Sequence, residues 1–148
     1  MTDLERLQAW LETYPRAGEL TSYQVDYTDQ LPGCFGVFPA GMVEVERTEN
    51  LLGQVTVQNQ YNFALYVVFA KAPGDTEGAQ INADWVMDFQ QWVQEQSVLR
   101  KAPTFGNIDQ HPERLRAENG ALYDAELTGT AMYMVRLAAT FWKHYEME

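Results

Sequence analysis

The sequence is poor in the side chains that most enzymes and metal sites need. Its 148 residues include one cysteine, Cys34, and two histidines, His111 and His144. A single cysteine excludes an internal disulfide and a cysteine-rich metal site. Cys34 lies in "PGCFG" with no histidine in a recognisable partner motif, and neither Ser22 nor Ser97 lies in a G-x-S-x-G turn. We therefore expect no enzymatic activity and no cofactor.

Basic side chains and long apolar runs are also scarce. The chain has 10 basic and 21 acidic residues, a formal net charge of -11 and a pI near 4.5. Such a surface repels phosphate groups, which disfavours sequence-independent binding to nucleic acid and binding to anionic membranes, and we expect no specific nucleic-acid partner. The longest apolar run, at 63–70, is far shorter than the roughly 20 residues that span a bilayer. The acidic N-terminal segment does not resemble a signal peptide.

One group of acidic and histidine side chains superficially resembles a metal site. Asp109, His111 and Glu113 alternate, which on a strand would place three ligands on one side. Pro112 interrupts that backbone, and His144 is too distant in sequence to be paired with the group. We expect no metal here.

Glycine and proline interrupt the region from 22 to 49. Tyr23, Val25 and Tyr27 alternate with polar residues and predict a strand, and Pro32-Gly33 marks a turn. Gly36, Pro39 and Gly41 are expected to break up the next segment before a short strand at Val43 and Val45. The spacing of Gly33, Gly36 and Gly41 fits no phosphate-binding loop, so we interpret them as turn glycines.

Two stretches have helical periodicity. The first has capping-box residues Thr2 and Glu5, an apolar face and a stop at Pro15; that face comprises Leu4, Leu7, Leu11 and Tyr14. The second has a polar face opposite an apolar one with Asn82 as a plausible cap; its apolar face comprises Ile81, Trp85, Phe89, Trp92 and Val93. Trp85 and Trp92 could line a ligand site, but packing against a sheet is the better interpretation.

The remaining apolar patterns indicate strands. Residues 54–69 alternate, and from Ala64 both faces are apolar, as in a strand that enters a covered centre. Asn119-Gly120 is a strong two-residue hairpin signal. The segment 130–145 fits a helical stripe and an alternating strand equally well, and the neighbouring hairpin favours the strand. The sequence predicts one α+β domain over 1–148: a mostly meander antiparallel sheet, with an N-terminal helix and a central amphipathic helix on one face.

Three stretches, in this order, carry a family resemblance. They are "LERLQAWLETYP" with the extended region after it, the aromatic strand "YNFALYVVFAK" leading to "WVMDFQQWV", and the closing "RAENGALYDAELTGTAMYMVRLAATFWKHYE". Together they resemble the minor capsid proteins of long-tailed bacteriophages and prophages and, more loosely, tail terminator proteins.

The resemblance implies a non-enzymatic subunit that assembles with its own copies into a ring, commonly a hexamer. The ring would end tail-tube polymerisation and contact head completion proteins. It implies a bacterial cytoplasmic location during assembly and then the head–tail junction of the virion, where DNA passes through the lumen. The alternative is a stand-alone binding module with an aromatic cleft for a small apolar ligand.

Overall fold

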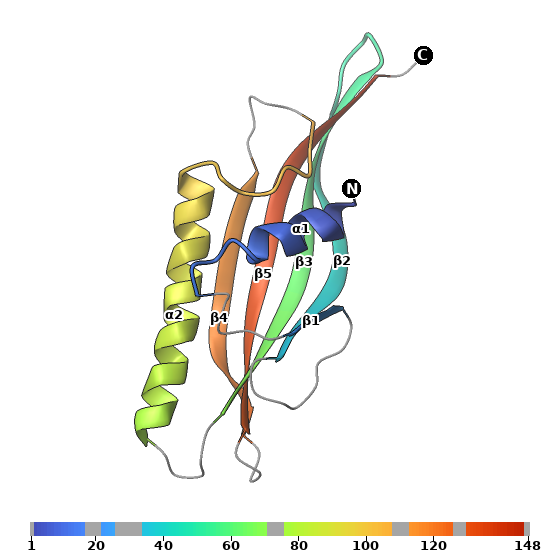
Figure 1. Ribbon diagram of the computed structural model, residues 1–148. Helices are drawn as coiled ribbons and strands as arrows, with labels where there is room; N and C mark the ends of the chain where they lie inside the picture. The colour runs from blue at the N-terminus through green and yellow to red at the C-terminus, as the bar shows by residue number, and fades with distance from the viewer. Residues whose placement is uncertain are drawn as a thin grey trace.

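The computed structural model describes residues 2–16, 22–25, 34–70, 76–107, 113–125 and 130–146. These ranges hold two helices, α1 (Asp3–Leu11) and α2 (Thr76–Val98), and one five-stranded sheet (Figure 1). The strands, in the spatial order β1-β2-β3-β5-β4, are β1 (Ser22–Val25), β2 (Cys34–Glu49), β3 (Gln54–Ala70), β5 (Thr130–Glu146) and β4 (Arg114–Ala125). The predicted α+β fold is confirmed. No described helix is long and apolar enough to cross a membrane.

The two central strands, β3 and β5, pair along their whole length. Their antiparallel register runs from Gln54↔Glu146 to Ala70↔Thr130. The pairs β2–β3 and β4–β5 are also antiparallel, whereas the short β1 is parallel to β2. The ambiguous segment 130–145 is therefore a strand, as predicted. Its alternation fits this place because its odd-numbered residues from 131 to 141 are buried on the helix side of the sheet.

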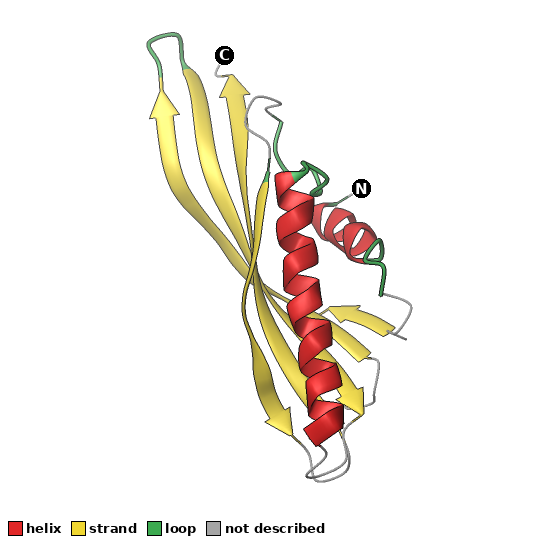
Figure 2. Cartoon of the chain, turned by 90° about the vertical axis from the view of Figure 1, so that its left-hand side faces the viewer, coloured by secondary structure: helices red, strands yellow, loops and turns green. Residues whose placement is uncertain are grey.

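Both helices lie on one face of the sheet (Figure 2). Trp85 is 2% exposed and stacks on Phe89, with ring centroids 5.7 Å apart. Trp92, which is partly buried, stacks on Trp10 of α1 at 4.7 Å. The predicted packing against the sheet is confirmed for Trp85, whose ring lies 5.3 Å from that of Phe69 in β3, whereas Trp92 packs on α1.

Two predictions for α2 are wrong: its start at Asn82 and the place of Ile81 on its buried face. The helix begins at Thr76, so Asn82 lies inside it and is 6% exposed instead of capping it. The buried positions are 82, 85, 86, 89 and 93, a stripe with spacings of three and four residues. Ile81 falls beside this stripe and is 58% exposed.

The first helix is anchored by hydrogen bonds at its N-terminal end. The Thr2 side chain accepts a hydrogen bond from the Glu5 N–H at 3.2 Å, as the capping pattern predicts. Tyr61 of β3 donates its hydroxyl to Asp3 at 2.6 Å. Burial, together with this hydrogen bond, raises the pKa of Tyr61 to about 12. The helix ends at Leu11, earlier than the predicted stop at Pro15.

The predicted hairpin at Asn119-Gly120 is wrong. β4 continues through both residues, and its register against β5 shifts between Glu118 and Ala121. Gly120 does not have the positive φ that a type I′ turn requires. A Cβ atom on Gly120 would clash with the Gln90 side chain and lie 2.6 Å from Val86 Cγ1. Glycine is needed here because α2 packs closely against β4, and the link between β4 and β5 lies outside the described residues.

The predicted breaks in the region 36–41 are also wrong. β2 is one strand of 16 residues, and two register shifts, at Pro39/Met42 and Glu44/Glu46, absorb the irregular residues. Gly41 has φ +89°, so it allows the bend at the first shift. The predicted strand at 23–27 is confirmed as β1 over Ser22–Val25, while the turn at Pro32-Gly33 lies outside the described residues.

Candidate functional site

The hairpin of β2 and β3 extends beyond both helices, with the end of β5 beside it (Figures 1 and 2). We call residues 42–60 of this hairpin the arm. Every residue from 39 to 52 is exposed. The exposed apolar side chains on β2 are Met42, Val43 and Val45, each 53% exposed. The arm therefore offers apolar surface that the core does not use.

The tip of the arm is an ordered turn. The Asn50 side chain accepts hydrogen bonds from the Leu52 N–H at 2.9 Å and the Gln54 N–H at 3.0 Å. Gly53 has φ +80°, which this turn requires. Leu51 and Leu52 are 105% and 82% exposed. The turn thus presents two adjacent leucines in a fixed backbone conformation, which lowers the entropy cost of binding through them.

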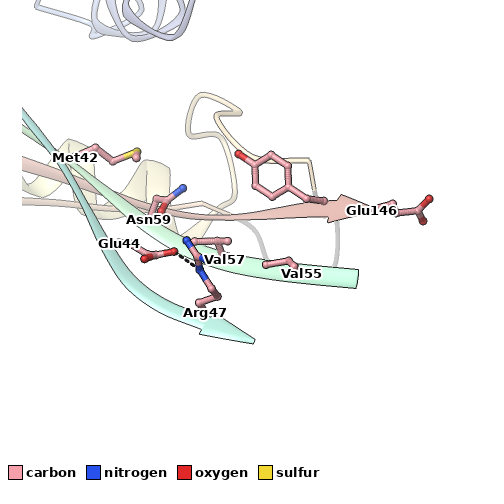
Figure 3. A pocket seen from close by; sticks show the side chains of 8 residues that line it. Met42, Glu44, Arg47, Val55, Val57, Asn59 and Glu146 are labelled. Atoms are coloured by element: carbon pink, nitrogen blue, oxygen red, sulfur yellow. Dashed lines mark hydrogen bonds and ion pairs between the residues drawn. The ribbon is translucent and has the colours of Figure 1, made fainter. Parts of the chain in front are cut away.

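One side of the arm is hollowed, as Figure 3 shows from close by. The hollow has a volume of about 540 Å³ and is lined by Met42, Glu44, Arg47, Val55, Val57, Asn59, Tyr145 and Glu146. Arg47 donates to Glu44 at 2.8 Å, and this hydrogen bond raises the pKa of Arg47. The lining combines apolar strand residues with one ion pair, which is the chemistry of an interaction surface.

The outer edge of β4 is closed by side chains of α2. Ser97 Oγ accepts a hydrogen bond from the Leu115 N–H at 3.1 Å, and Gln90 Nε2 donates to the Ala117 carbonyl at 3.0 Å. These bonds occupy backbone groups that an incoming strand would otherwise use. β4 is therefore a protected edge.

The end of β5 beyond β4 is closed by Asn107. Its side chain accepts from the His144 N–H at 2.7 Å and donates to the His144 carbonyl at 3.0 Å. Its own N–H donates to the Trp142 carbonyl at 3.3 Å. Asn107 thus pairs with β5 as one residue of a neighbouring strand would.

The outer edge of β2, unlike the edge of β4 and the end of β5, is open along the arm. β1 pairs with Cys34–Val37 only, and within the described ranges no segment pairs with β2 beyond Val37 on that side. Glu44, Glu46 and Glu49, together with the two register shifts, discourage pairing between two such edges. The open edge and the apolar tip belong to the same arm, which makes the arm the candidate interaction site.

The residues considered as catalytic or metal-binding have other roles or lie elsewhere. Glu113 accepts the backbone N–H groups of Phe105 at 3.1 Å and Gly106 at 3.0 Å, so it holds a loop. Asp109 and His111 lie outside the described residues. The residues that the structure does describe contain no group of three His, Cys, Asp or Glu side chains suited to a metal.

The remaining candidates are dispersed. His144 Nδ1 lies 3.2 Å from the Thr56 hydroxyl, and its Nε2 lies 3.8 Å from Glu146. Ser97 closes the β4 edge, as described above. Cys34 and Ser22 begin β2 and β1, and their side chains are outside the described set.

Sequence reasoning missed the arm tip, although a signal was present. The stretch "ERTENLLGQ" places two adjacent leucines and a glycine in a polar segment between two extended runs. In comparisons with known proteins, the chain matches no family model and no curated protein.

Proposed function

We propose that this protein is a structural subunit of a bacteriophage or prophage head–tail junction. In this role it is a tail terminator-like ring protein that ends tail-tube polymerisation and contacts head completion proteins. The observation that carries the proposal is the arm, an ordered hairpin whose β2 strand is exposed and whose tip, Leu51-Leu52, contributes nothing to the core. The sequence resemblance to minor capsid proteins supports the same role.

A ring needs two different contact patches on every subunit, because each copy binds one neighbour on each side. The arm supplies one such patch without any rearrangement of the helix-covered core. The net charge of -11 per subunit also suits a lumen through which DNA moves without adhering.

The alternative, a binding module with a cleft lined by Trp85, Trp92 and the tyrosines, is less favoured because both tryptophans pack inside the protein. Trp85 is 2% exposed, and Trp92 is stacked on Trp10. These rings form the layer between helices and sheet, so we favour the assembly role.

The proposal is tested by deleting the gene from the phage or prophage that encodes it and imaging the particles by electron microscopy. We expect tails of uncontrolled length and heads that remain unjoined, with both defects repaired by the wild-type gene. Normal tails joined to heads in the deletion strain would contradict the proposal.

A further inference from the structure

The sheet face opposite the helices carries a second hollow, of about 550 Å³. Small side chains of the two central strands, Ala64 and Ala138, line it together with Tyr66 and Met134. Arg116 and Arg136 also border it. Glu118 and two amide side chains complete the polar part of the lining, so the hollow combines an apolar surface with a small excess of positive charge. Neither described helix covers this face.

Along β4 and the adjoining part of β5, basic side chains outnumber acidic ones on this face although the protein is acidic. Arg114, Arg116 and Arg136 are three of the 10 basic residues, and the register of β4 against β5 directs all three away from the helices. Glu118 lies on the same face, 3.6 Å from Arg116 and directly opposite Arg136 in the register of the two strands. Among the residues described, Arg114 and Arg136 make no ion pair. The strip therefore favours an acidic partner.

The arm has the complementary composition. Leu51 and Leu52 form its apolar tip. On β2, Glu46 is paired with Gln58 and Glu49 with Val55, so the hairpin carries one of these carboxylates on each of its two faces. Glu49 is 3.9 Å from Arg47, a weak contact at a surface position, and Glu46 makes no ion pair within the described ranges. Two exposed leucines, with a carboxylate on each face of the hairpin, match an apolar hollow in which two arginines outnumber one glutamate.

We infer that the arm tip of one subunit seats in the open-face hollow of a second copy of this chain. Leu51 and Leu52 fill the apolar part, and Glu46 and Glu49 face Arg116 and Arg136. The inference rests on the proposed ring assembly and names the contact that would build it. Because the two patches differ, the contact is head-to-tail and closes a ring or extends a filament. Contact between two arms would bring like charges together.

The contact is tested by disulfide trapping in a Cys34→Ser background. The double variant Leu51→Cys/Ala138→Cys should give a series of covalent oligomers on mild oxidation, because each copy carries both halves of the contact. An equimolar mixture of the two single variants should stop at a dimer. The matched control is Val98→Cys/Ala138→Cys, which places another exposed cysteine, at the end of α2, and should give only background linkage.

Two outcomes of the trapping would overturn the inference. The first is linkage in the test variant no greater than in the Val98 control. The second is efficient dimer formation by Leu51→Cys alone, which would show that two arms meet. Circular dichroism on each variant confirms that it is folded before oxidation.

Charge reversal provides an independent measurement. Arg116→Glu/Arg136→Glu should weaken self-association at least tenfold in sedimentation, and adding Glu46→Arg/Glu49→Arg to the same chain should restore it. Unchanged association in the first variant, or duplex DNA that binds the wild type and not that variant, would overturn the inference.

The two proposals fail separately. The tail and head phenotype of the deletion does not depend on which surfaces meet, so absent trapping beside a clear phenotype refutes only the arm contact. Trapped oligomers beside a normal deletion phenotype refute only the head–tail role.

Discussion

The two halves of β3 serve different purposes in one continuous strand. In the covered half, Leu65 and Val67 are at most 1% exposed beneath the helices. In the arm half, β3 is held in place by its pairing with β2 and β5, and every residue of β2 in the arm is exposed. Strand pairing can therefore carry a hairpin well beyond the core. The exposed apolar side chains of β2 and of the arm tip therefore stabilise the fold little and are available for binding.

Truncating one side chain in each half gives the largest expected contrast. Trp85→Ala should lower the free energy of unfolding by about 3–5 kcal/mol, because it removes a fully packed ring and leaves a cavity. Leu51→Ala should change it by less than about 0.5 kcal/mol. Urea unfolding measures both, and equal losses would abolish the distinction between core and arm.

The next largest loss of stability is expected where α2 approaches β4 closely in the covered half. Gly120→Ala should cost about 1–3 kcal/mol, because its Cβ would overlap Val86 and Gln90. Ala121→Ser, one residue along on an exposed site, is the control and should be nearly neutral. A stability loss at Ala121 equal to that at Gly120 would show that the helix contact is not the cause.

The protected edge of β4 can be opened by one substitution. Ser97→Ala removes the acceptor for the Leu115 N–H and should cost about 1 kcal/mol. Hydrogen exchange at Leu115 should speed up, whereas Ser97→Thr, which keeps a hydroxyl, should stay close to wild type. Unchanged exchange in Ser97→Ala would mean that this bond does not close the edge.

Tyr61, at the boundary between the covered half and the arm, should make the free energy of unfolding depend on pH in alkaline solution. Tyr61 has a pKa of about 12 in the fold against 10.0 for an unperturbed tyrosine, so above pH 10 the unfolded chain releases its proton first. The free energy of unfolding should therefore fall as pH rises from 10 to 12. Tyr61→Phe should show a shallower fall, with a remainder from Tyr133, whose pKa burial also raises. Identical pH slopes would contradict this assignment.

The sequence predicted the features that depend on local pattern. The Thr2 cap, the alternation in 54–69 and the strand character of 130–145 follow from side-chain spacing. Gly120 and Gly41 were misread because both are glycines that fit a turn as well as a close approach or a bulge. For Gly120, only the position of α2 in the fold shows that glycine is needed for a close approach. For Gly41, only the register of β2 against β3 shows that glycine allows a bulge. The arm could not be predicted because the spacing of side chains along a strand does not show which part of that strand the helices cover.

The claim that the arm serves binding and not folding is tested most directly by comparing Leu51→Ser/Leu52→Ser with Val98→Ser/Leu99→Ser. Both double variants replace adjacent exposed apolar residues, at the arm tip and at the end of α2. Each is followed by sedimentation velocity over a concentration series and by urea unfolding. We predict that the tip variant loses self-association at unchanged unfolding free energy, while the control behaves as wild type. A tip variant that is destabilised but associates normally would contradict the claim.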